Sequence, residues 1–393
     1  MKYCIVILDG ITDRKYTRIN KKTPLEIART FGLDEISTKG CLGMVQTIPP
    51  NFPCNTIVST MSILGLDPNL YYTGIAPLEA KDQQIEMHSE DWSFCCDFVS
   101  LSEGNMADPQ AGKLFFQESI NLLQDLQQYL GKEDFHFLPL YQNHHLLCFP
   151  KGKFRNIQTK DPFDLKGKPI KKHYPVGEGS EQLIEIMEKA HEFLQNHDIN
   201  KVRRDLGENL ANGIWIWSGG QIPFLPPWSE IFGLKAALVA HSYGVRGLSK
   251  ILGIQIIDVP GATGTWETNY AEKTKQALQA IENVDCVFIH IGSLMDVARY
   301  HGVSDKVRAI ESIDSYVIRP LLQKLPSPFR LMVVGGHYIS AEDGISQNQP
   351  VPFAIIGEDF PGSGRNLTFT EQNAKKVDIN IANGEELLRF FLK

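Results

Sequence analysis

The sequence has no long apolar run, no cluster of basic residues and no two cysteines spaced as in a CxxC motif. A helix that spans a membrane needs roughly 18 to 20 apolar residues in a row, so no membrane span is predicted. Nucleic-acid binding requires a basic face, whereas Lys and Arg are dispersed here and the formal net charge is −7. We therefore expect neither a membrane protein nor a nucleic-acid-binding protein.

The chain has seven cysteines, an odd number that does not suit a framework of disulfides. Cys95 and Cys96 are adjacent, and a bridge between them would be strained, so buried thiols are predicted at both positions. The first apolar run is too short for a secretory signal and is typical of a strand. Free thiols without a secretory signal together predict a protein of the reducing cytoplasm.

Short runs rich in Val and Ile alternate with amphipathic helical segments along most of the chain. Such runs are typical of strands that are buried on both faces of a parallel sheet. The alternation predicts an α/β fold, with a doubly wound core around a mostly parallel sheet. The predicted strands are Tyr3–Leu8, Gly213–Trp217, Ala236–Ala240, Gln255–Val259, Cys286–Ile291, Arg330–Val334 and Val351–Ile356.

This alternation is interrupted between residues 86 and 179. There "SFCCDFVSLSE" and "FHFLPLYQNHHLLCFP" resemble strands, and "QESINLLQDLQQYLG" between them has helical spacing. At 393 residues the chain is long enough for two domains, because single cores stop growing at roughly 250–300 residues. We predict a core formed by residues 1–85 and 180–393, with a smaller α+β domain, residues 86–179, inserted into it.

Polar residues follow several predicted strands, at the edge where open α/β sheets bind their ligands. Asp9 follows the first strand, His337 follows the strand Arg330–Val334, and Thr56 lies close to the start of a helix. A hydroxyl at a helix N-terminus, near a carboxylate and an imidazole, suits a nucleophile that accepts a phosphoryl group beside a metal. The residues thus indicate Thr56 as a candidate nucleophile, with Asp9 and His337 as candidate metal ligands.

A series of sequence blocks resembles, in the same order, blocks of the archaeal-type cofactor-independent phosphoglycerate mutases of the alkaline phosphatase superfamily. The blocks are "ILDG", "KTPLEIA", "SILGLDPNLYYTGIAPLEA", "DLKGKPI", "GEGSE", "GENLANGIWIWSGG" and "IDVPGATGTWETNY". The resemblance extends nearly end to end and implies an alkaline-phosphatase-type core with an inserted domain. It also implies two divalent metals, usually manganese, and a serine that takes a phosphoryl group and returns it to the other hydroxyl of glycerate.

Carried over by position, the resemblance places Asp9 at a metal aspartate, Thr56 at the nucleophilic serine and His337 at a metal histidine. Most other metal positions differ: Met295 and Gly336 stand where the family has aspartates and offer no hard-cation ligand, and Ser346 stands where it has a histidine. Arg299 also stands at a family histidine and brings a permanent positive charge. Beside the nucleophile, Ile57 replaces an aspartate and Thr60 replaces an asparagine. A pair of metals roughly 4 Å apart is therefore not expected.

The phosphate-binding positions also differ. In the inserted domain the resemblance places Cys95 and His144 where the family has arginines that hold phosphate, and Phe163 where it has a histidine. Because neighbouring strand residues point to opposite faces, His144 and His145 are not expected to share a metal. Arg246 remains a candidate phosphate contact, and Arg299 could hold a phosphate or carboxylate where a metal ligand once stood.

Two interpretations of function follow. In the first, which the changed positions favour, catalysis is altered or lost and the ancestral cleft binds an anionic metabolite or a protein partner. In the second, the protein is an active phosphomutase or phosphohydrolase that uses Thr56 with a single divalent metal, Mn or Zn, on Asp9 and His337. The sequence leaves open whether nearby side chains replace the lost ligands; the candidates are Asp296, His301, Glu342 and Asp343.

Overall fold

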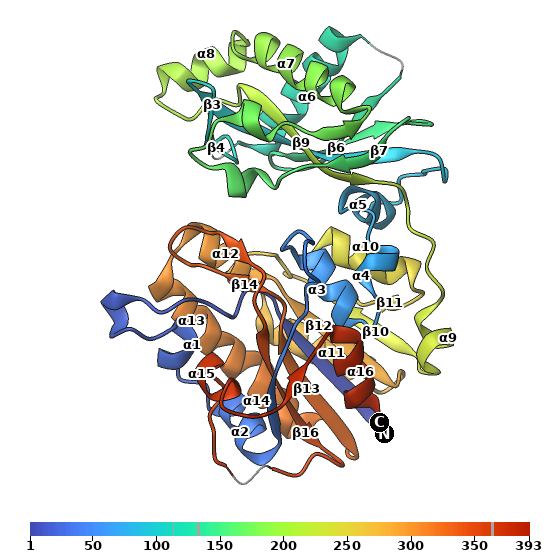
Figure 1. The fold of residues 1–393 in the computed structure, drawn as a ribbon, viewed down its shortest axis with the longest axis vertical. Coiled ribbons are helices and arrows are strands. Elements are labelled where there is room, and N and C mark those ends of the chain that lie inside the picture. The colour runs from blue at the N-terminus through green and yellow to red at the C-terminus, as the bar shows by residue number, and fades with distance from the viewer. Residues whose placement is uncertain (113, 132–133, 363–364) are drawn as a thin grey trace. The chain divides into compact units, whose positions relative to one another are not determined.

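The computed structural model describes residues 1–112, 114–131, 134–362 and 365–393. These residues fold into two compact units. The first unit consists of residues 1–72 and 224–393, and the second consists of residues 73–223 (Figure 1). The second unit is therefore inserted into the first.

The first unit is built on an eight-stranded sheet with the order β11-β10-β12-β1-β13-β16-β2-β17. The five strands from β11 to β13 run parallel, whereas β16 is antiparallel to both of its neighbours. The predicted α/β core with a mostly parallel sheet is confirmed. The strands are β1 (Lys2–Leu8), β2 (Cys41–Val45), β10 (Ala236–Val239), β11 (Gln255–Ile256), β12 (Cys286–Ile291), β13 (Phe329–Gly335), β16 (Val351–Gly357) and β17 (Asn380–Ile381).

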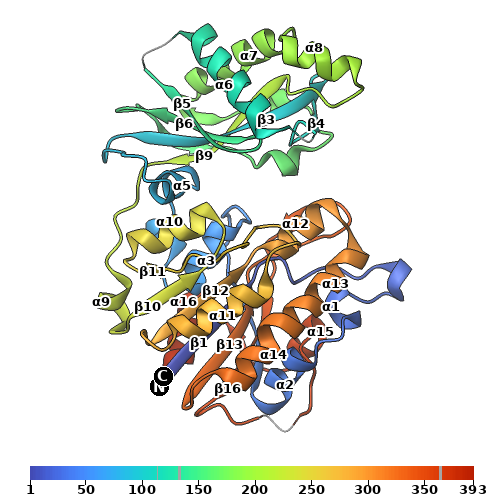
Figure 2. The ribbon, with the colours of Figure 1, turned by 180° about the vertical axis from the view of Figure 1, so that it is seen from behind.

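Helices cover both faces of this sheet, which explains why its central strands are apolar on both sides. Helices α2 and α11 to α14 pack on one face, around Val6, Leu8 and Val333 (Figure 2). Helices α3, α10 and α16 lie on the other face (Figure 1). The helices of this unit are α1 (Pro24–Ile27), α2 (Phe31–Lys39), α3 (Thr56–Ile63), α4 (Pro68–Tyr71), α9 (Trp228–Phe232), α10 (Tyr243–Ile251), α11 (Tyr270–Ala280), α12 (Ser293–Tyr300), α13 (Val303–Ile313), α14 (Arg319–Lys324), α15 (Glu371–Ala374) and α16 (Gly384–Leu392), with a 3-10 turn η1 (Thr17–Ile19) and a π-helical turn η4 (Asp314–Ile318).

The second unit contains a five-stranded antiparallel sheet in which β3 pairs with β4, β6 and β9. Its core lies between this sheet and helices α6 and α7, whereas α5 packs on the opposite face. The strands are β3 (Trp92–Ser102), β4 (Asn105–Asp108), β5 (His136–Tyr141), β6 (His144–Phe149), β7 (Arg155–Gln158), β8 (Val176–Glu178) and β9 (Gly213–Gly220); the helices are α5 (Ala76–Asp82), α6 (Phe116–Leu130), α7 (Ser180–Leu194), α8 (Asp198–Asp205), η2 (Pro162–Leu165) and η3 (Ile170–His173).

The inserted unit extends beyond the predicted segment 86–179 on both sides. The strand predicted at Gly213–Trp217 is present as β9, but it pairs antiparallel with β3 and does not belong to the parallel sheet of the core. A fully buried strand has the same apolar composition in either sheet, so composition alone misplaced it. All seven cysteines are free thiols, and Cys95 and Cys96 are buried as predicted. Among the described helices none is both long and apolar enough to cross a membrane.

A buried ion pair ties helix α13 to the loop that follows β1. The Lys306 ammonium lies 2.9 Å from Asp13 Oδ2 and also donates to the carbonyl of Ile339 at 2.9 Å. Both charged side chains are fully buried. Asp13 also accepts the backbone N–H of Ala341, so one carboxylate joins the segments that follow β1 and β13.

We expect Lys306→Met to lower the free energy of unfolding by about 3–5 kcal/mol, because it leaves the Asp13 carboxylate buried without its partner. The matched control is Arg308→Met on the same helix, whose partner Asp305 forms an exposed pair expected to contribute about 1 kcal/mol or less. Urea unfolding followed by circular dichroism measures both. An equal loss of unfolding free energy in the two variants would show that the buried Lys306–Asp13 pair does not stabilise the fold more than the exposed pair does.

Candidate functional site

Three neighbouring strands of the core sheet bring polar side chains to one edge. β1 lies between β12 and β13 and runs parallel to both, so the carboxyl ends of the three strands are adjacent. Asp9 directly follows β1, and His337 follows β13 after Gly336. His290 is the next-to-last residue of β12. Parallel pairing thus places one carboxylate between two imidazoles.

Thr56 joins this group from helix α3, of which it is the first residue. Its hydroxyl donates a hydrogen bond of 2.5 Å to Asp9 Oδ2. Asn55 caps the helix by accepting the N–H of Val58, which fixes where the helix begins and hence where Thr56 stands. The three residues selected from the sequence, Asp9, Thr56 and His337, therefore lie together.

His290 is a member of the group that the sequence analysis missed. Its Nε2 lies 3.6 Å from Asp9 Oδ2, and its side chain is buried. A histidine inside "CVFIHI" was counted as part of an apolar strand. The available signal was its position at the carboxyl end of that strand, where a polar residue is suited to bind a ligand.

The charges at this edge favour an ionised Asp9. Burial acts against the charged form, but the nearby imidazoles of His337 and His290 outweigh it and hold the pKa of Asp9 well below its usual range. The carboxylate is therefore negative at neutral pH. It accepts the Thr56 hydroxyl hydrogen with a full negative charge, although it is completely buried.

Several polar atoms of this group have no hydrogen-bond partner within the described part of the chain. They are Asp9 Oδ1, His290 Nε2 and both ring nitrogens of His337. Asp9 Oδ1 and His337 Nδ1 are 2.7 Å apart but are not aligned for a hydrogen bond. Two ligand atoms of one cation typically lie about 3 Å apart. Because buried polar atoms are normally bonded, this donor set fits a single divalent cation.

The chain resembles known proteins over its whole length. Residues 37–200 match the family model described as 2,3-bisphosphoglycerate-independent phosphoglycerate mutase. The protein of that name from Methanothrix thermoacetophila is 34% identical, and the one from Methanosarcina barkeri is 31% identical, with all of both chains covered in each case. The chain belongs to the 2,3-bisphosphoglycerate-independent phosphoglycerate mutase family.

Solved structures agree with the fold of this family. The PH0037 protein from Pyrococcus horikoshii superimposes with a TM-score of 0.77 at 26% identity, covering 100% of this chain and 96% of the other. The cofactor-independent phosphoglycerate mutase from Thermoplasma acidophilum gives a TM-score of 0.60 at 24% identity, covering 100% and 99%. At that lower identity the likeness concerns the fold alone.

Met295 and Gly336, which the resemblance placed at metal-ligand positions, have close packing contacts. Met295 lies against an apolar cluster that contains Ile339 and Ala341. At Gly336, an added Cβ atom would lie 2.2 Å from Asp9 Oδ1. The Asp9 carboxylate therefore occupies the space that a side chain at position 336 would need.

The remaining sequence candidates make contacts of their own. Arg246 on α10 pairs with Asp258 at 3.0 Å, and Arg299 on α12 packs against the position of Gly344. Neither observation tests their roles as anion contacts, which stay predictions. The four proposed replacement ligands have partners too: Asp296 with His301 at 3.8 Å, and Glu342 and Asp343 with Arg14.

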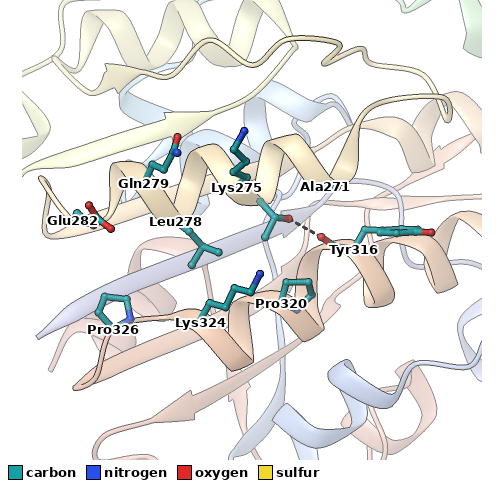
Figure 3. A pocket seen from close by; sticks show the side chains of 10 residues that line it. Ala271, Lys275, Leu278, Gln279, Glu282, Tyr316, Pro320, Lys324 and Pro326 are labelled. Carbon is teal, nitrogen blue, oxygen red and sulfur yellow. Dashed lines mark hydrogen bonds between the residues drawn. The ribbon is translucent and has the colours of Figure 1, made fainter.

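A surface hollow of about 460 Å³ lies elsewhere in the first unit, between helix α11 and the η4–α14 segment (Figure 3). Its lining includes Leu278, Pro320 and the lysines Lys275 and Lys324. Thr274 donates to the carbonyl of Tyr316 at 2.8 Å and so joins its two walls. None of the residues that line this hollow belongs to the group around Asp9.

The packing at Gly336 leads to a double-mutant prediction. Gly336→Ala should lower the free energy of unfolding by about 2 kcal/mol or more, because the new methyl group collides with the Asp9 carboxylate. In an Asp9→Ala background the same substitution should cost less, because the contacts with the carboxylate are removed while the Cα of residue 9, at 3.0 Å, stays close. Urea unfolding of the four proteins measures the coupling. An equal cost in both backgrounds would show that Asp9 does not occupy the space beside position 336.

Proposed function

We propose that this protein is an altered member of the mutase family. It holds one divalent cation at the Asp9 site and handles a phosphorylated small molecule at Thr56. The observation that carries the proposal is the convergence of unsatisfied donors from Asp9, His290 and His337 beside the Thr56 hydroxyl. Conversion of 3-phosphoglycerate to 2-phosphoglycerate is then lost or strongly reduced. Seven free thiols support a cytoplasmic setting for this activity.

The proposed cation site would be formed by one carboxylate oxygen of Asp9 and by ring nitrogens of His337 and His290. Such a cation supplies Lewis-acid stabilisation of negative charge on a bound phosphoryl group. A second cation is not supported, since Met295 packs among apolar side chains and Gly336 offers neither a ligand nor room for one. Both positions carry an aspartate in the family, by the resemblance described above.

The side chains around Thr56 can prepare its hydroxyl for reaction. The hydroxyl is oriented by Asp9 Oδ2, which is held in its ionised form and accepts the hydroxyl hydrogen bond. The N-terminus of α3 favours negative charge, so a phosphoryl group is stabilised next to this oxygen. The Thr56 oxygen is thus oriented by the Asp9 carboxylate and lies where the helix N-terminus stabilises the negative charge of a phosphoryl group.

Recognition of the substrate is expected to differ from that of the family. Cys95 and His144 stand at the positions of arginines that hold phosphate, by resemblance, and His144 lies between the carboxylates of Glu79 and Asp97. Two carboxylates repel a phosphate group unless another positive charge is supplied. The inserted unit therefore does not offer the family's pair of arginines to a phosphoglycerate molecule.

A second candidate is an ordinary mutase. It is favoured by the relatives from Methanothrix thermoacetophila and Methanosarcina barkeri, which are named 2,3-bisphosphoglycerate-independent phosphoglycerate mutase. They are 34% and 31% identical to this chain over their full length.

Metal content and turnover of the purified protein separate the two candidates. With manganese added, we expect one equivalent bound at the Asp9 site and turnover of 3-phosphoglycerate at least about 100-fold below that of an intact family member, corresponding to roughly 2.7 kcal/mol of lost transition-state stabilisation. Asp9→Asn should abolish the binding of that equivalent. Two manganese ions bound near Asp9 together with family-level turnover would establish the ordinary mutase.

The role of Thr56 is tested with a near-isosteric substitution. Any phosphoryl transfer to or from small phosphate esters should be lost in Thr56→Val, which keeps the shape but removes the hydroxyl, and be retained in Thr56→Ser. Transfer that survives in Thr56→Val would exclude Thr56 as the nucleophile. Circular dichroism of both variants shows whether the fold is unchanged.

A further inference from the structure

A second group of potential metal ligands lies in the inserted unit, on the face of its sheet that α5 covers. Glu79, Cys95 and His144 each offer one ligand atom, and these atoms lie within 4.8 Å of one another. All three side chains are buried. The group lies in the inserted unit, whereas Asp9 lies in the first unit, and the two groups share no residue.

The strand period explains why these residues meet. Cys95 and Asp97 are two residues apart in β3, so their side chains point to the same face, while Cys96 points to the opposite face and joins the core against α6 and α7. His144 begins β6 and pairs in register with Asp97. Glu79, on α5, contacts both His144 and Cys95 on this face.

The distances are close to those of ligands around one cation. Glu79 Oε2 lies 2.8 Å from His144 Nε2 and 3.8 Å from Cys95 Sγ. Around a tetrahedral zinc ion, with bonds of about 2.0–2.3 Å, neighbouring ligand atoms are roughly 3.3–3.6 Å apart. The carboxylate and imidazole would separate by roughly half an ångström, and the thiol would approach slightly, which side-chain rotation can provide.

The other ring nitrogen of His144 is already held in the manner of a metal-binding histidine. His144 Nδ1 contacts Asp97 Oδ1, and Asp97 Oδ2 accepts a hydrogen bond of 3.0 Å from Trp217 Nε1. Histidines that bind metals almost always donate their second ring N–H to a carboxylate or carbonyl, which fixes the ring and its tautomer. Here the arrangement leaves Nε2 directed at Glu79.

We propose that Glu79, Cys95 and His144 form a zinc site, with Asp97 as a positioning residue for His144. A thiolate and an imidazole select zinc over manganese or magnesium, which prefer oxygen ligands. Zinc displaces the proton of Cys95 Sγ and the proton shared by His144 Nε2 and Glu79 Oε2, so two protons leave as one dication enters. Three protein ligands leave the fourth position for water or for an anionic group of a small molecule.

Cobalt substitution tests this site in the full-length protein. After chelation and removal of bound metals, Co²⁺ should bind and produce the near-ultraviolet charge-transfer absorption of a thiolate–cobalt bond. The site around Asp9 has no sulfur ligand, so cobalt bound there gives no such band. Zn²⁺ added afterwards should displace Co²⁺ and remove the absorption. A wild-type protein without this band overturns the proposal, whether or not any variant folds.

Matched variants assign the ligands. Cys95→Ser should abolish the band, whereas Cys148→Ser, which changes another buried thiol on the same face, should retain it. Asp97→Asn should weaken zinc binding about 10- to 100-fold without removing the band, as expected for a positioning residue. The double variant Asp9→Asn/His337→Ala should leave the band unchanged. A band that persists in Cys95→Ser, or is lost in that double variant, would refute the assignment.

Discussion

The site in the first unit depends on one constraint: Asp9 is completely buried between two imidazoles that come from the strands on either side of its own. Parallel pairing of β1 with β12 and β13 fixes this order, because it aligns the carboxyl ends of all three strands. The Asp9 charge in turn holds the Thr56 hydroxyl at the start of α3. Asp13 accepts hydrogen bonds from Lys306 and from the backbone of Ala341, and so links the segment that follows Asp9 to the segment that follows His337.

Much of the fold could be predicted from the sequence, since strands buried on both faces are unusually apolar and alternate with amphipathic helices. This pattern located the central strands of the core and the strand–helix–strand order of the insert. It could not assign β9, because burial makes a strand apolar whichever sheet it joins. The pairing partner of a strand is decided by packing between distant segments, here by contact with β3, and leaves no trace in local composition.

In the candidate sites, too, the sequence could locate some residues and not others. Asp9, Thr56 and His337 follow strand ends or begin a helix, so position along the chain was enough to select them. His290 lies inside an apolar run and was missed. Glu79, Cys95 and His144 come from a helix and two strands, and nothing in the spacing of these residues relates them. The expectation that His144 and His145 point to opposite faces did hold: His144 contacts Glu79 beside α5, while His145 contacts Ser119 of α6.

The close approach of Asp9 to position 336 limits which residues this position can accept. Any side chain there would need space that the Asp9 carboxylate fills. An aspartate would in addition bring a like charge to within contact distance of Asp9, so Gly336→Asp requires the Asp9 side chain to move or a cation to lie between the two carboxylates. The residue at position 336 and the position of the Asp9 side chain are therefore coupled, and a change in one requires a change in the other.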